Sequence, residues 1–111
     1  MEDKVRKIIS RNVQTLLKVH GMTPMDLARK AEVSPSFLGR MLKLETNVSN
    51  EKLDIVAKPF GYEGWVLASP FFNPDVSQEQ YNSLMSILCD EDLTDEKIKM
   101  IVEFAKFQSK T

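Results

Sequence analysis

Apolar residues recur at intervals of three and four along most of the chain, which is the spacing of one helical face. The first such run covers residues 4–19 and stops before Gly21, a residue typical of helix C-termini. Later runs cover residues 24–31, 35–42 and 63–68. Three more runs begin after the caps Ser49, Ser77 and Thr94. The run after Ser49 ends at Lys58, before Pro59, and the run after Ser77 carries its apolar residues between Tyr81 and Leu88. No strand pattern interrupts these runs, so the sequence predicts an all-α protein.

Two matching helix-start signals lie close together in the first half of the chain. They are Met22-Thr23-Pro24 and Val33-Ser34-Pro35, each an apolar residue, a hydroxyl residue and a proline. The hydroxyl can accept a hydrogen bond from a first-turn N–H, and proline suits the first helical position. Two short helices joined at residues 32–34 are therefore predicted, with the small Ala28 allowing them to cross closely. This arrangement indicates a helix-turn-helix, whose second helix enters the major groove of DNA.

Over residues 5–68 the chain resembles the Cro/repressor-type, or Xre-like, helix-turn-helix regulators. The resemblance rests on GMTPMDLARKAEVSPSFLGRML (21–42) and NVSNEKLDIVAKPFGY (47–62), with Leu27-Ala28 in the first helix and Leu38 inside the second. It implies a five-helix lambda-repressor-like DNA-binding bundle, here followed by two C-terminal helices. The chain departs from the family at Glu32, where a glycine is usual, and at Pro24 and Pro35, where polar side chains are usual.

The segment SPFFNPDVS (69–77) contains two prolines and breaks the helical periodicity. It predicts a boundary between a DNA-binding domain, residues 1–69, and a C-terminal helical extension, residues 70–111. Charge is divided in a similar way, because residues 1–61 carry a net charge of +4 and residues 62–111 a net charge of −5. A basic front half and an acidic back half suggest that only the front half meets a polyanion.

The outer face of the second short helix supplies the candidate DNA contacts. Arg40 is expected to bind a guanine edge, or otherwise a phosphate, and Ser36 a base edge or a phosphate. Phe37 either presses on a thymine methyl group or packs under the loop 44–48. The residues expected to contact phosphates are Thr23, Ser34, Lys43 and Asn47, of which Thr23 and Ser34 act first as helix caps. Arg11, Arg29 and Lys30 are interpreted mainly as solvated charges.

A single helix-turn-helix reads few base pairs, so such proteins commonly pair on two half-sites. The C-terminal helices are too small to form a core of their own, and they are predicted to form a homodimer interface. The residues assigned to this interface are Tyr81, Leu84, Leu88, Ile101, Phe104 and Phe107. The alternative is that they only cover Trp65, Phe71 and Phe72 within one chain.

The sequence gives little support to a zinc-binding, catalytic or membrane-spanning function. The single histidine and the single cysteine, His20 and Cys89, do not supply a usual zinc site, and Cys89 is expected to be buried. No catalytic set, Gly-rich phosphate loop, cofactor site or membrane-spanning run is found, so a cytoplasmic protein is expected. The family resemblance implies a bacterial or phage origin. The hypothesis is a homodimeric repressor on a palindromic operator. The alternative is a protein-interaction module of the same fold, such as an antitoxin or an adaptor that binds through its acidic helices.

Overall fold

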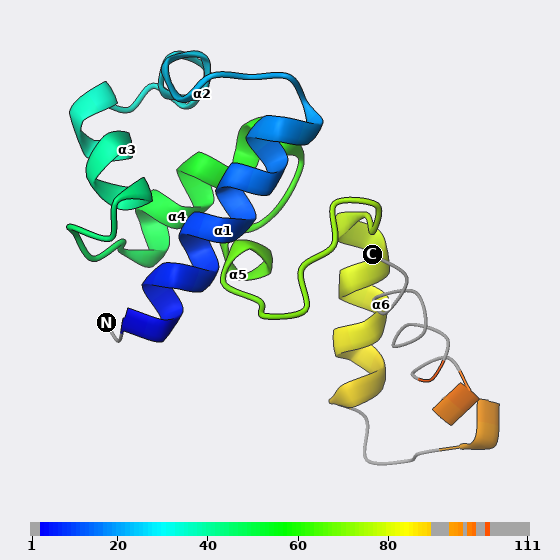
Figure 1. Ribbon diagram of the computed structural model, residues 1–111. Helices are drawn as coiled ribbons and strands as arrows, with labels where there is room; N and C mark the ends of the chain where they lie inside the picture. The colour runs from blue at the N-terminus through cyan, green and yellow to red at the C-terminus, as the bar shows by residue number, and fades with distance from the viewer. Residues whose placement is uncertain (1–2, 90–93, 97, 100–101, 103–111) are drawn as a thin grey trace.

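The computed structural model describes residues 3–89, 94–96, 98–99 and 102, and every regular element within them is helical. Figure 1 shows α1 to α5 gathered in one bundle and α6 standing beside it. The elements in chain order are α1 (Asp3–Val19), α2 (Pro24–Ala31), α3 (Pro35–Leu42), α4 (Asn50–Ala57), the 3₁₀ turn η1 (Lys58–Phe60), α5 (Gly64–Leu67) and α6 (Gln78–Leu88). The predicted all-α class is confirmed for these residues.

Helix boundaries follow the local chemistry of the sequence. Four of the predicted cap side chains accept a hydrogen bond from a first-turn N–H of the helix that follows them, namely Thr23, Ser34, Ser49 and Ser77. Gly21 ends α1 in the left-handed conformation, with φ +61°. The next N–H, of Met22, donates to the carbonyl oxygen of Leu17 at 2.8 Å and closes the helix.

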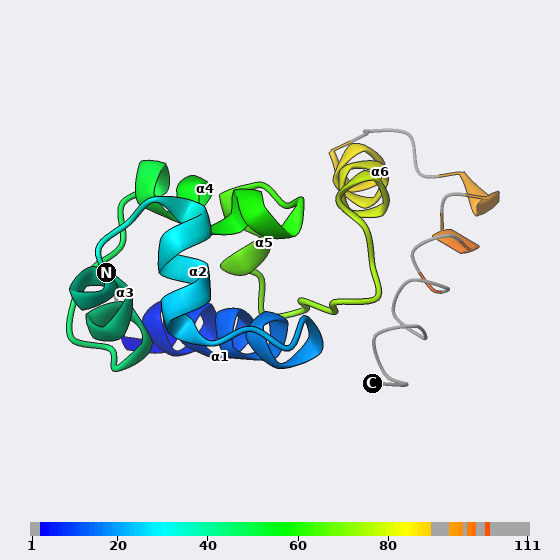
Figure 2. The ribbon, with the colours of Figure 1, turned by 90° about the horizontal axis from the view of Figure 1, so that it is seen from above.

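One apolar core joins α1 to α5. Most inward positions predicted for α1 to α4 are almost fully buried, among them Ile9, Val13, Leu16, Leu27, Leu38, Met41 and Val56, and Leu67 of α5 joins them. The buried Asn12 amide of α1 donates to the carbonyl oxygens of Leu67 at 2.8 Å and Ser69 at 2.9 Å. Seen from above in Figure 2, α2 crosses over α1 and leads to α3 at the edge of the bundle. The core thus holds α2 and α3 in fixed positions relative to α1.

The start of α5 lies unusually close to α4. The Gly64 N–H donates to Asp54 Oδ1 at 2.7 Å. A Cβ atom on Gly64 would meet Asp54 Oδ1 at 2.6 Å, the Asp54 backbone nitrogen at 2.8 Å and the Leu53 carbonyl carbon at 3.0 Å. Only glycine allows this approach of two backbones, so Gly64 fixes where α5 sits on α4.

The proline-rich segment 69–77 does not separate two independently packed parts. Val66 of α5, Val76 of the segment and Tyr81 of α6 form a second apolar cluster, and Tyr62 and Phe72 pack against it. The Tyr81 ring stacks on Phe72 with ring centroids 6.4 Å apart, and it meets Tyr62 edge to face at 6.4 Å. The first turn of α6 is therefore attached to the bundle across the predicted boundary.

Two tyrosine hydroxyls tie the backbone of this segment in place. The Tyr62 hydroxyl donates to the carbonyl oxygen of Val76 at 2.7 Å, and the Tyr81 hydroxyl accepts from the Asn73 N–H at 2.7 Å. Burial, with smaller effects from Tyr81 and Asp75, raises the pKa of Tyr62 above its usual value. The segment is thus held by specific hydrogen bonds as well as by apolar packing.

Two predictions about the C-terminal part concern the burial of Cys89 and a helix after Thr94. Cys89 is exposed at the end of α6, so the expectation that it is buried is wrong. The helix predicted after Thr94 lies mostly outside the described residues, although the Ile98 N–H donates to the Thr94 carbonyl oxygen at 3.0 Å.

Among the described residues, the helices are too short or too polar to cross a bilayer.

Candidate nucleic-acid interface

The two short helices of the candidate interface begin with different caps. At α2, the Thr23 hydroxyl accepts from the Asp26 N–H at 3.1 Å, and Asp26 Oδ2 accepts from the Thr23 N–H at 3.0 Å, which completes a capping box. The hydrogen bond from the Thr23 backbone, followed by that from its side chain, holds the pKa of the Asp26 carboxyl below its usual value. The N-terminus of α2 therefore already holds an anion, which disfavours a phosphate at Thr23.

The N-terminus of α3 carries no such carboxylate. The Ser34 hydroxyl accepts from the Phe37 N–H at 3.0 Å, and the first turn of α3 contains no acidic residue. Its positive end is therefore open to an anion from outside. Of the two capping residues proposed as phosphate contacts, the structure favours Ser34.

The turn between the helices places Glu32 in the left-handed conformation, with φ +56° and ψ +41°. This is the position where the family pattern has glycine, and a side chain there costs about 1–2 kcal/mol. The turn is closed by the Val33 N–H, which donates to the carbonyl oxygen of Ala28 at 3.0 Å. The backbone at Glu32 is thus strained by its positive φ, and the turn keeps α2 and α3 close together.

Replacing Glu32 by glycine should raise the free energy of unfolding by about 0.5–1 kcal/mol, because relief of strain exceeds the added entropy of the unfolded chain. Urea unfolding followed by circular dichroism measures the change. The matched control is Glu45→Gly in the next loop, an exposed glutamate without a positive φ, which should show no gain. Equal shifts in both variants would argue against strain at Glu32.

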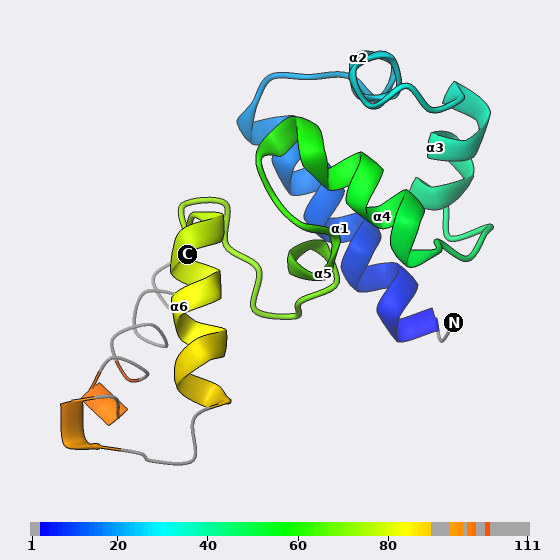
Figure 3. The same ribbon diagram turned by 180° about the vertical axis from the view of Figure 1, so that it is seen from behind.

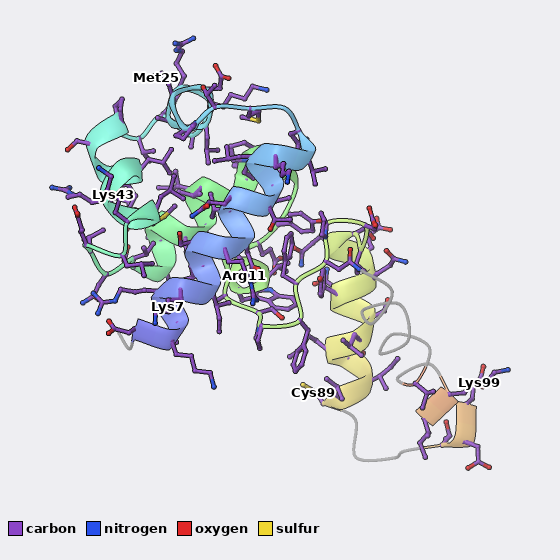
Figure 4. The ribbon with its side chains drawn as sticks, viewed as in Figure 1. Lys7, Arg11, Met25, Lys43, Cys89 and Lys99 are labelled. Atoms are coloured by element: carbon purple, nitrogen blue, oxygen red, sulfur yellow. The ribbon has the colours of Figure 1, made fainter. Side chains whose placement is uncertain are left out.

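Three of the predicted DNA contacts on α3 and at its C-cap, two for bases and one for a phosphate, lie on the outer side of the helix. Ser36, Arg40 and Lys43 are exposed, and their spacing of four and three residues puts them on one helical face. Leu38 and Met41, at 0% and 2% exposure, anchor the opposite face in the core. Figure 4 shows Lys43 pointing outward from α3, away from α1. The helix thus presents polar and cationic groups while its apolar side stays fixed.

The Phe37 side chain packs against its own chain and also stays partly exposed. Its ring is half-buried against the core, and the Lys52 ammonium nitrogen of α4 lies 5.5 Å from the ring centroid. Lys52 therefore lies beside the candidate interface, a placement that sequence reasoning missed because the contact is tertiary. The capping residue Ser49 places Lys52 in the first turn of α4, but no spacing rule links it to α3.

The loop after α3 adds one exposed candidate and one strained residue. Asn47 is exposed, as a phosphate contact requires. Leu44, three residues earlier, adopts φ +64°, an unusual conformation for a bulky side chain. Leu44 is half-buried, its N–H donates to the Met41 carbonyl oxygen at 3.3 Å and the Glu45 N–H donates to that of Arg40 at 2.9 Å, so backbone hydrogen bonds hold the loop at the end of the helix.

The residues assigned to a homodimer interface differ in their exposure to solvent. Leu88 is 54% exposed and Leu84 is half-buried on α6, while Ile101, Phe104 and Phe107 lie outside the described residues. Tyr81 is 2% exposed and is enclosed by its own chain, so its assignment to the interface is corrected. Its packing near Trp65 and Phe72 matches the intrachain alternative for this one residue.

Neither a metal site among the described residues nor a similar known protein indicates the function of the chain. Among the residues that the structure describes, no three His, Cys, Asp or Glu side chains gather closely enough to hold a metal ion. Comparison with family models, curated proteins and solved structures finds no match. The function must therefore be argued from the geometry of this chain.

Proposed function

We propose that this chain is a transcription regulator that binds double-stranded DNA as a homodimer, with α1 to α5 as a lambda-repressor-like bundle. The observation that carries the proposal is the exposed polar face of α3, with Ser36, Arg40 and Lys43 together and Ser34 at the N-terminus. A short helix held at the edge of a bundle in this way fits the major groove. Binding of this bundle in the major groove would occlude a promoter, so repression is the outcome that we propose.

In vitro selection from random duplex DNA at near-physiological salt tests the proposal. A palindromic motif with half-sites about ten base pairs apart is the expected result for a dimer with two recognition helices. Binding without any motif, abolished as salt rises, would contradict sequence-specific regulation, because only the phosphate contribution would remain.

The substitution Arg40→Ala should weaken binding to the selected DNA by about 1–3 kcal/mol and relax preference at one base position per half-site. The guanidinium is the side chain on this face that can make a bidentate contact with guanine. Titrating the variant against the selected sequence and against its single-base substitutions measures both effects.

Lys43→Ala is the matched control on the same face of α3. Removing the lysine that contacts a phosphate should weaken binding to all sequences about equally and lower the salt dependence. If Arg40→Ala behaves in this same way, Arg40 contacts a phosphate and base reading falls to Ser36 and Phe37.

The proposed dimer uses the apolar side of α6 that the bundle leaves uncovered. Met85 and Leu88 are 42% and 54% exposed, and Ile98 and Val102 further along the chain are each 46% exposed. Exposed apolar side chains such as Met85 and Leu88, three residues apart on α6, favour a protein contact. Leu88→Asp should therefore convert the dimer to monomer, as measured by sedimentation velocity.

Ser86→Asp provides the control for Leu88→Asp, because it adds the same charge at an exposed position on another side of α6. It should leave the dimer intact. An unchanged dimer mass for Leu88→Asp would exclude this face from the interface, while a shift in both variants would indicate a general effect of charge.

A second candidate function is a protein-interaction module, such as an antitoxin or an adaptor. It is favoured by the same uncovered apolar side chains on α6 and by Pro24 and Pro35, which provide no hydrogen-bonding side chain at the starts of α2 and α3. Co-purification of a second protein in stoichiometric amount would support it, and failure of DNA selection would then leave it as the better proposal.

A further inference from the structure

A groove between the end of α2, the following turn and α4 lies next to the candidate interface, because its Lys52 contacts Phe37. It has a volume of about 670 Å³, and its apolar floor includes Val33 and Ile55. Three lysines line it, Lys30 from α2, Lys52 from α4 and Lys58 at the end of α4. Glu32 is the acidic residue among its lining side chains. The groove thus combines an apolar floor with a net positive rim.

These properties favour an acidic peptide over a DNA backbone. Phosphate contacts need exposed cations but no apolar floor, whereas a peptide with acidic and apolar residues uses both. Lysine stems can pack along apolar groups while their ammonium groups reach the carboxylates at the rim. A second groove, along α1, also combines three cations, Lys7, Arg11 and Lys18, with two leucines, Leu42 and Leu44, but its remaining lining residues, Ser10, Gln14 and Thr15, are polar.

The chain itself contains a segment of the complementary chemistry. Residues 88–96, LCDEDLTDE, carry five acidic residues and two leucines. The segment follows α6, which leaves the bundle on the side opposite α2 and α3, as Figures 1 and 3 both show. A groove beside α2 is therefore better placed for the segment of another molecule than for its own.

We propose that the lysine-lined groove between α2 and α4 binds the acidic segment 88–96 of a second copy of this chain. The contact is reciprocal, so each copy gives its segment and receives that of its partner. This inference rests on the dimer of the proposed function but does not depend on DNA binding. It explains the opposite charges of the two halves of the chain as a device for self-association.

Charge reversal tests the contact on the full-length chain. The variant Lys30→Glu/Lys58→Glu changes two exposed groove lysines and avoids Lys52, which contacts Phe37. Its homodimer dissociation constant should rise about tenfold or more, because like charges then face each other. Lys7→Glu/Lys18→Glu on α1 is the control with the same change of charge, and its dissociation constant should stay near that of the wild type.

A mixing experiment decides between contacts within and between molecules. Asp90→Lys/Glu91→Lys/Asp92→Lys gives the segment a net positive charge and should also dimerise weakly, but mixed with Lys30→Glu/Lys58→Glu it restores opposite charges at both grooves. Native mass spectrometry of the equimolar mixture, which resolves the two chains by mass, should show the heterodimer as the main dimer. A contact within one molecule gives no such preference.

Several results would overturn the proposal. They are a monomeric wild type at high micromolar concentration, an equal effect of the α1 control, and the absence of a preferred heterodimer. Weaker DNA binding by Lys30→Glu/Lys58→Glu with an unchanged dimer would assign the groove to phosphates instead. Because the dimer measurements contain no DNA, their failure is distinct from a failure of the selection experiment.

Discussion

The substitution Tyr81→Ala is expected to lower the free energy that holds α6 against the bundle by about 3–5 kcal/mol, the range for removing a buried aromatic ring. Tyr81 is 2% exposed and packs with Val66 and Val76. Hydrogen exchange followed by mass spectrometry should show faster exchange of residues 62–88. Residues 9–57 should keep their protection, because their core does not contain this ring.

Tyr81→Phe separates the ring from the hydroxyl. It keeps the stack on Phe72 and removes the oxygen that accepts from the Asn73 N–H, so the expected loss is about 1 kcal/mol. If Tyr81→Ala left exchange in residues 62–88 at the wild-type rate, the attachment of α6 through this side chain would be wrong.

The substitution Gly64→Ala should destabilise the protein by about 3 kcal/mol, the upper range for overpacking. The added Cβ would lie within 3.0 Å of backbone atoms of Asp54 and Leu53, and backbone cannot rotate away as a side chain can. Relief requires α5 to move off α4, which disturbs Val66 and Leu67, both fully buried. Thermal and urea unfolding followed by circular dichroism measure the loss.

Gly39→Ala is the natural control, because it makes the same chemical change inside another helix. A Cβ on Gly39 meets nothing within 4 Å, so the variant should gain about 0.5–1 kcal/mol from its higher helix propensity. Opposite signs for the two substitutions would attribute the effect to the close approach at α5. A neutral Gly64→Ala would show that α5 can shift without cost.

The local elements were predictable because their causes lie within a few residues of sequence. The Ser34 cap and the buried position of Leu38 follow from a hydroxyl, a proline and a spacing of three and four residues. The capping box at Thr23 was only half predictable, since an aspartate, Asp26, stands where a longer glutamate or glutamine is usual. The positive φ at Glu32 was not predictable, because sequence gives the residue but not its backbone angle.

The tertiary contacts were not predictable in the same way. Helical spacing places Tyr81 and Leu88 on one apolar face, but it does not say whether their own chain covers them. The structure covers Tyr81 with the loop that carries Phe72 and leaves Leu88 exposed. Likewise, no pattern brings Lys52 to Phe37, because that contact depends on how α3 and α4 cross.

The attachment of α6 also bears on how such a protein can be recombined with others. The Glu63 N–H donates to Gln78 Oε1 at 2.7 Å, and the Tyr62 hydroxyl reaches the carbonyl oxygen of Val76. A crossover placed at the prolines of 69–77 would therefore divide one folding unit between two parents. A chimera that exchanges the C-terminal helices should instead be joined beyond Tyr81, where α6 has already made its last contact with the buried cluster.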